Sequence, residues 1–118
     1  MKINMNYENF RSWLEKQPDD RHFTPQDGEN CPIANYLKDQ LKEQFPEEEL
    51  ISTSVGSENS SLVYPENPYG KSIENPRWAV EFIELFDERS ESSPASPRVA
   101  LMILDKSNEK MFKGEYDV

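Results

Sequence analysis

Prolines constrain the folding of this chain more than any other feature, because they fix where helices begin and end. A proline holds φ near about −65° and lacks an N–H, so it suits the first position of a helix and disfavours helical geometry in the residue before it. Pro18 and Pro46 each follow an amphipathic stretch and should end a helix. Pro32, Pro76 and Pro97 each precede an apolar stretch and should begin one.

The first two helices are predicted at 7–17 and 32–45. In 7–17 the apolar side chains fall on one side of a helix, and Asn6 can act as the N-cap by accepting a hydrogen bond from an N–H of the first turn. In 32–45 the apolar residues recur at every fourth position, and charged residues cover the opposite side. This spacing is typical of an amphipathic helix.

Two further helices are predicted in the second half of the chain. Segment 77–89 combines an Asn-Pro start with a wide apolar arc, and this favours a helix. Apolar side chains also alternate at 78, 80 and 82, so a strand is the alternative. The apolar run 99–104 is too short for periodicity to assign. Its Ser-Pro start favours a short helix that ends near Lys106, with a strand as the alternative.

The middle of the chain carries the strand signals. Residues 50–55 alternate between apolar and polar, as in a strand with one exposed face, and 61–64 can return as its antiparallel partner. Residues 65–75 contain two prolines and a glycine and are predicted to be irregular. The expected fold class is α+β in a single domain over 1–118: two N-terminal helices, a small antiparallel β-hairpin, then one long and one short C-terminal helix.

Three segments connect or follow these elements. The loop 18–30 is long, because connections in compact domains have a median of about 4–6 residues. Phe23 is the apolar side chain expected to pin this loop to the core. Residues 90–96 are predicted to be a serine-rich connector, and 107–118 a tail.

The charge balance restricts the class of partner. The chain carries 13 Lys and Arg against 23 Asp and Glu, a net charge of −10. Nucleic acids and anionic membranes would repel such a chain, so direct binding of either is not expected. The longest apolar run has six residues, the N-terminal segment lacks a secretory-signal pattern, and there is one cysteine. These features predict a cytoplasmic protein without transmembrane segments or internal disulfides.

One hypothesis is a small thiol-dependent enzyme or redox sensor. Cys31 directly precedes a predicted helix, whose free N–H groups lower the pKa of a thiol. His22, in the preceding loop, is the available base. A Cys-His nucleophile also needs an orienting group and an oxyanion site, and the sequence marks neither. Packing at the start of the helix is therefore the favoured interpretation of Cys31.

Other cofactor chemistry finds no support in the sequence. One histidine and one cysteine are too few for a structural zinc site. Asp27-Gly28 lacks the surrounding ligands of a calcium loop. The four glycines are scattered and form no nucleotide-binding motif. We therefore predict no metal and no cofactor.

An acidic stripe is the most informative polar feature of the predicted 77–89 helix. Carboxylates recur at i, i+3, i+7 and i+10 along one side: Glu81, Glu84, Glu88 and Glu91. Neighbours at this spacing lie about 5–6 Å apart, on the scale of phosphates along a nucleic-acid strand. A solvated face that confers solubility is the favoured interpretation of the stripe, and the alternative is a surface that fits a basic protein, as a nucleic-acid mimic would.

Two tyrosines are further candidates for partner binding. Tyr64 and Tyr69 are flanked by prolines in or beside the segment predicted to be irregular. Exposed tyrosines in turns often anchor protein interfaces, so we expect this pair to lie at the surface.

Three stretches taken together resemble small uncharacterised actinobacterial, cyanobacterial and phage proteins that share a Cys-Pro-Leu/Ile-Ala helix start. The stretches are Cys31-Pro32-Ile33-Ala34 with Tyr36-Leu37, Pro76 with Trp78-Ala79 and Phe82-Ile83, and Ala100-Leu101 with Ile103-Leu104. The resemblance covers about residues 6–105. It implies the same order of elements, with helices over 78–86 and 99–104, and it implies no activity because none is attached to that group.

The sequence thus favours a non-enzymatic protein–protein interaction or regulatory module that acts through an acidic helix face on a basic partner surface. The thiol-dependent enzyme or redox sensor that uses Cys31 with His22 is the alternative. The identity of the partner and the oligomeric state are not predicted.

Overall fold

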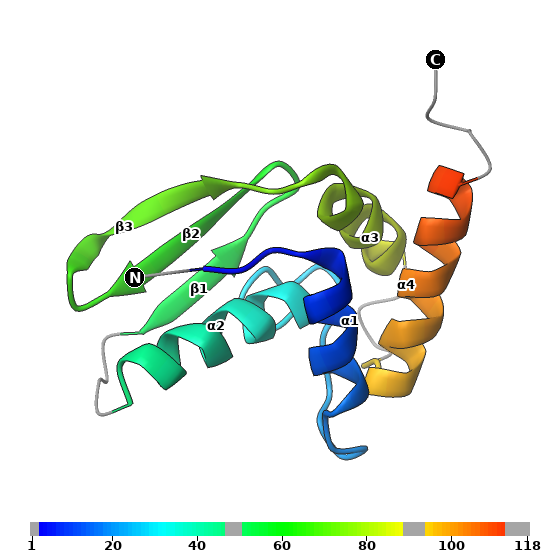
Figure 1. The fold of residues 1–118 in the computed structure, drawn as a ribbon, viewed down its shortest axis with the longest axis horizontal. Coiled ribbons are helices and arrows are strands. Elements are labelled where there is room, and N and C mark those ends of the chain that lie inside the picture. The colour runs from blue at the N-terminus through cyan, green and yellow to red at the C-terminus, as the bar shows by residue number, and fades with distance from the viewer. Residues whose placement is uncertain (1–2, 47–50, 89–93, 113–118) are drawn as a thin grey trace.

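The computed structural model describes residues 3–46, 51–88 and 94–112. Four helices and three strands follow one another along the chain (Figure 1): α1 (Tyr7–Glu15), α2 (Pro32–Gln44), β1 (Ser52–Val55), β2 (Asn59–Tyr64), β3 (Asn67–Glu74), α3 (Arg77–Asp87) and α4 (Pro97–Phe112). The α+β class is confirmed. In Figure 1, α2 runs along the sheet, and α1, α3 and α4 gather at one end of it.

The helix boundaries follow the capping residues and prolines, with one exception. The Asn6 side chain accepts a hydrogen bond from the Asn9 N–H and caps α1, as predicted. The Ser96 hydroxyl accepts from the Val99 N–H at the start of α4. At α3, however, Pro76 itself is the N-cap residue. Asn75, expected to cap this helix, is instead buried and bonded within the sheet, where it accepts from the Ser60 hydroxyl.

The sheet has three antiparallel strands in the order β1-β2-β3, so the predicted hairpin was incomplete. Residues 67–74, within the segment predicted to be irregular, form β3 along β2, with Ser61 opposite Ser72. The register shifts between Leu62 and Tyr64, and Gly70 has a φ of +95°. A proline and a glycine are tolerated because β3 is an edge strand, and no alternating burial pattern marked it.

The last helix is longer than expected. The prediction of a helix rather than a strand for 99–104 is confirmed, but α4 continues to Phe112 instead of ending near Lys106. The start of the predicted tail is therefore helical, and Ser107 is buried with its hydroxyl donating to the Leu104 carbonyl. Residues 89–93, which comprise the last residue of the predicted 77–89 helix and the first part of the predicted serine-rich connector, and residues 113–118 lie outside the described residues.

The long loop 18–30 is fixed at several points. Phe23 is fully buried, as predicted, and its backbone exchanges two hydrogen bonds of 2.8 Å with Ala95. The Arg21 guanidinium bonds the Asp39 carboxylate at 3.0 and 3.4 Å and lies 5.2 Å from the centroid of the Trp13 ring. These contacts tie the loop to α1, α2 and the start of α4.

An aromatic cluster joins the N-terminal helices to α3. Phe10 is fully buried and packs edge-on against Tyr36 of α2 and Phe82 of α3. The Trp78 indole N–H donates to the Met5 carbonyl at 2.9 Å, which fixes the start of α3 against the N-terminal segment. None of the helices in the described part of the chain is long and apolar enough to cross a membrane.

Candidate functional site

The acidic stripe lies on the side of α3 that faces away from the core. Apolar residues at i, i+3, i+4 and i+7 turn the other side inward: Ala79, Phe82, Ile83 and Phe86 are buried. Glu84 and Glu88 are exposed, and Glu81 is half-buried. Glu91 lies outside the described residues. The structure therefore brings Glu81, Glu84 and Glu88 together along one side of one helix.

A groove runs beside this stripe, and we call it the α3 groove. It has a volume of about 350 Å³. One wall is formed by the end of α3 and its C-cap, with Ile83, Glu84, Asp87 and Glu88. The other wall is formed by the loop before α2 and by the end of β1 with the turn that follows it, with Gln26, Gly28, Val55, Gly56 and Ser57. Three segments distant in sequence thus form one concave surface.

Hydrogen bonds hold the loop wall of the α3 groove in place. The Gln26 backbone N–H donates to Asp87 Oδ1 at 2.9 Å, and its side-chain amide donates to the Asp87 carbonyl at 3.0 Å. The Val55 N–H donates to the Gly28 carbonyl at 2.8 Å. A Cβ on Gly28 would lie only 2.7 Å from the Val55 carbonyl oxygen, so this close approach of the loop to β1 requires glycine.

Acidic side chains lie at the negative end of the α3 dipole. Asp87 is the last helical residue and Glu88 the C-cap, and no basic residue lies in the last turn. Acidic groups at the negative end of a helix dipole cost about 0.3–1 kcal/mol each. The ion pairs among the described residues lie elsewhere, between Arg11 and the acids Glu15 and Asp105 and between Arg21 and Asp39. The carboxylates at the end of α3 therefore have no internal counterion in that part of the chain.

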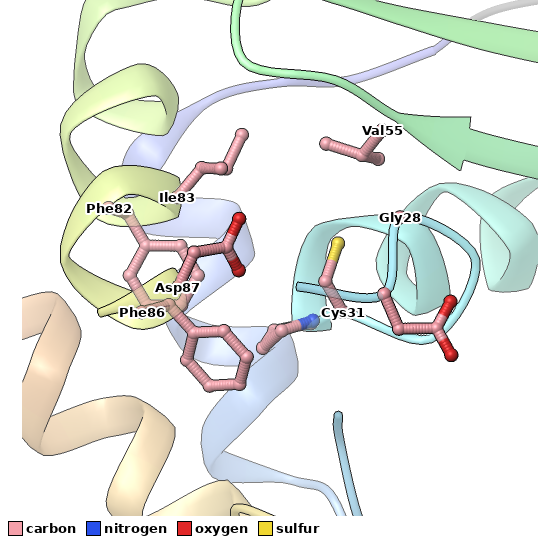
Figure 2. Close-up of a pocket in the computed structure, with 9 residues that line it drawn as sticks. Gly28, Cys31, Val55, Phe82, Ile83, Phe86 and Asp87 are labelled. Atoms are coloured by element: carbon pink, nitrogen blue, oxygen red, sulfur yellow. The ribbon is translucent and has the colours of Figure 1, made fainter. Parts of the chain in front are cut away.

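Cys31 lines a small cavity (Figure 2) that shares Gly28, Val55, Ile83 and Asp87 with the α3 groove. Its thiol caps α2 by accepting from the Ala34 N–H at 3.4 Å. Burial raises the pKa of the Cys31 thiol to about 12, and this outweighs the lowering effect of the hydrogen bonds at the start of the helix. The lowered pKa that the thiol hypothesis requires is therefore absent, and the cavity, about 10 Å³, has room for one water at most.

His22 does not serve Cys31 in this geometry. His22 is exposed, whereas Cys31 is buried at 6% exposure. The cavity beside the thiol is lined by side chains from the 27–32 segment, β1 and α3, and His22 is not among them. The predicted pairing of the two residues as nucleophile and base has no support among the described contacts.

The two tyrosines have different surroundings. Tyr69 on β3 is 98% exposed, as predicted. The prediction for Tyr64 was wrong, because Tyr64 is 4% exposed and stacks on Phe45 with ring centroids 5.9 Å apart. It lies on the inward-facing side of β2, which the neighbouring proline did not reveal. The start of β3 lies at the opposite end of the sheet from α3 (Figure 1), so Tyr69 and the acidic stripe do not form one patch.

Metal binding is not indicated in the part of the chain that the structure describes. Those residues contain no group of three or more His, Cys, Asp or Glu side chains placed to hold an ion.

Of the nine residues that line the α3 groove, only Glu84 and Glu88 were identified from the sequence as site residues. Gln26, Gly28 and Asp87, whose contacts hold the loop wall in place, were missed. Asp27-Gly28 was considered only as part of a calcium loop. The position of Gly28 within a long polar loop was the one available signal that the backbone of this loop lies close to another segment. Gln26 has a φ of +62°, which nothing in the local sequence indicates, since glutamine is not a typical left-handed residue.

Comparison of the chain with protein-family models, curated proteins and solved structures gives no significant match. The resemblance to small bacterial and phage proteins therefore stays a prediction, and function has to be inferred from the residues themselves.

Proposed function

We propose that this protein is a non-enzymatic interaction or regulatory module that binds a basic protein surface through the acidic side of α3. One observation carries the proposal: Glu84, Asp87 and Glu88 crowd the negative end of the α3 dipole with no basic residue in its last turn. A basic partner would neutralise charge that destabilises the free chain. Binding would then gain from relief of this repulsion as well as from new contacts.

The test is capture of partners from cell extract on the immobilised full chain, at low and at high salt. The wild type is compared with an α3-neutral variant (Glu81→Gln, Glu84→Gln, Glu88→Gln). The matched control neutralises three exposed acids outside α3: Asp20→Asn, Glu43→Gln and Glu66→Gln. Both variants change the net charge from −10 to −7.

We expect a basic protein that binds the wild type and the control, is released by salt, and is lost with the α3-neutral variant. Equal loss with both variants would show that only overall charge matters. Binding that survives high salt would point to an apolar surface instead.

Tyr69 is a second proposed contact, because a tyrosine that is 98% exposed has no structural role in the core. Its distance from α3 means that it would engage a large partner separately. Tyr69→Ser should weaken capture without changing its salt dependence.

The thiol-dependent alternative has no specific observation in its favour, since Cys31 is buried with a raised pKa and His22 does not line its cavity.

A further inference from the structure

The α3 groove combines apolar walls with an acidic edge. Figure 2 shows Ile83 and Asp87 of α3 on one side of the small cavity and Val55 and Gly28 on the other, and these four residues also line the α3 groove. Val55 and Ile83, which are 8% and 7% exposed, form the apolar part of its lining, while Glu84, Asp87 and Glu88 supply carboxylates on the α3 side. An occupant that matches both parts needs an apolar stem and a cationic end.

We infer that the α3 groove binds an arginine side chain presented by the basic partner. This inference rests on the proposed function and specifies the chemistry that the partner brings to α3. The methylene groups of the arginine lie against Val55 and Ile83, and its guanidinium faces the carboxylates at the end of the helix.

The Asp87 carboxylate has capacity for such a ligand. Its Oδ1 accepts from the Gln26 N–H, whereas no hydrogen bond from the described residues reaches its Oδ2. Guanidinium has five N–H donors in a planar fork and is more weakly hydrated than ammonium. It can therefore bond Asp87 and a neighbouring glutamate at once, which favours arginine over lysine.

The groove is also held in a fixed shape before any partner arrives. The left-handed backbone of Gln26, with a φ of +62°, is a conformation that costs about 1–3 kcal/mol in a non-glycine residue. Both bonds from Gln26 to Asp87 maintain it. A preformed wall lowers the entropy lost on binding. The volume of about 350 Å³ lies within the range of pockets that hold small ligands, about 300–1,000 Å³.

The test uses a minimal probe, N-acetyl-arginine methylamide, titrated into the full chain while backbone amide and methyl shifts are followed by NMR. N-acetyl-citrulline methylamide is the neutral control of the same shape, and the lysine analogue tests the guanidinium preference. We expect saturable shifts at Gly28, Val55 and Ile83 with the arginine probe, weaker binding of the lysine analogue, and no saturable shifts with citrulline.

Two variants test the site in different ways. Asp87→Asn keeps an acceptor for the Gln26 N–H but removes the charge, and should raise the dissociation constant about tenfold. Ser57→Tyr keeps the charge and fills the groove from an exposed turn position, and should abolish the shifts. The matched control Glu74→Gln, on the edge strand, should leave them unchanged.

Shifts spread over many acidic residues, or equal weakening by Asp87→Asn and Glu74→Gln, would overturn the inference, because either result means diffuse attraction. Absence of saturable binding would also overturn it. The proposed function fails separately, if the α3-neutral variant still captures the basic partner. If the α3-neutral variant loses the partner while Ser57→Tyr still binds it, the proposed function stands and only the groove inference fails.

Discussion

Glu84→Gln is expected to stabilise the folded protein, because Glu84 has three like-charged neighbours on the surface of α3. Glu81 lies three residues before it, Asp87 three after it and Glu88 four after it, spacings at which helix side chains meet. Glu84 also lies close to the negative end of the helix dipole. Glutamine and glutamate have nearly equal helix propensity, so the substitution isolates the charge.

The size of the effect follows from these pairs. Each like-charged pair costs about 0.2–0.5 kcal/mol, so removing three should increase the free energy of unfolding by roughly 1 kcal/mol at low ionic strength. For a domain of this size the melting temperature should rise by about 4 °C. The assay is thermal unfolding followed by circular dichroism at about 0.01 M and about 1 M salt, where the Debye length is about 30 and 3 Å. The gain should largely disappear at the higher salt concentration.

The matched control is Glu15→Gln. Glu15 also lies in the last turn of a helix, but its carboxylate pairs with Arg11 at 3.5 Å, so its neutralisation should leave the melting temperature unchanged or slightly lower. An unchanged or lowered melting temperature for Glu84→Gln would refute the view that α3 carries uncompensated charge. A rise that is the same at both salt concentrations would show that the gain is not electrostatic.

Further predictions concern the loop 18–30 and Cys31. Gly28→Ala should lower the free energy of unfolding in urea by about 2 kcal/mol, because its Cβ meets the Val55 carbonyl oxygen at 2.7 Å and displaces a buried hydrogen bond. Arg21→Met should lower the free energy of unfolding by about 1–2 kcal/mol, because the partly exposed ion pair with Asp39 and the cation–π contact with Trp13 are lost. The effects of Arg21→Met and Asp39→Asn should be less than additive in the double variant. Cys31 should react with iodoacetamide at neutral pH only after unfolding. The pKa of the Cys31 thiol is raised from 9.0 to about 12 in the folded state. The contribution of this thiol to stability is therefore fully present below about pH 9 and is lost as the pH rises towards 12. In Cys31→Ala the free energy of unfolding should fall less steeply over this pH range.

Wild-type stability of Gly28→Ala would mean that the loop does not approach β1 closely. Strict additivity of the Arg21 and Asp39 substitutions would mean that the pair contributes nothing to the fold. Rapid labelling of native Cys31 would restore the thiol hypothesis.

The elements predicted from local signals agree with the structure to within two residues at α1, α2 and α3. Their boundaries depend on a cap or a proline next to an amphipathic stretch, and both signals are local in sequence. β3 was missed because Pro68 and Gly70 oppose strand formation locally, whereas pairing with β2 decides the outcome. Tertiary pairing overrides propensity at such positions.

The acidic stripe was predictable because it follows the 3.6-residue period of one helix. The α3 groove was not, since Gln26 and Asp87 are 61 residues apart and meet only through hydrogen bonds of the folded chain. The error at Tyr64 has the same origin: side-chain direction on β2 depends on the register of the sheet, which the sequence does not reveal.

Whether α3 binds a basic protein surface can be measured by site-specific photocrosslinking in cell extract. A benzophenone side chain is placed at position 84 or, as the control, at position 43 on the exposed side of α2. We expect position 84 to crosslink to a basic protein at low salt but not at high salt, and we expect position 43 to give no crosslink. Crosslinks of equal yield from both positions, or from position 43 alone, would contradict the assignment of α3 as the binding surface.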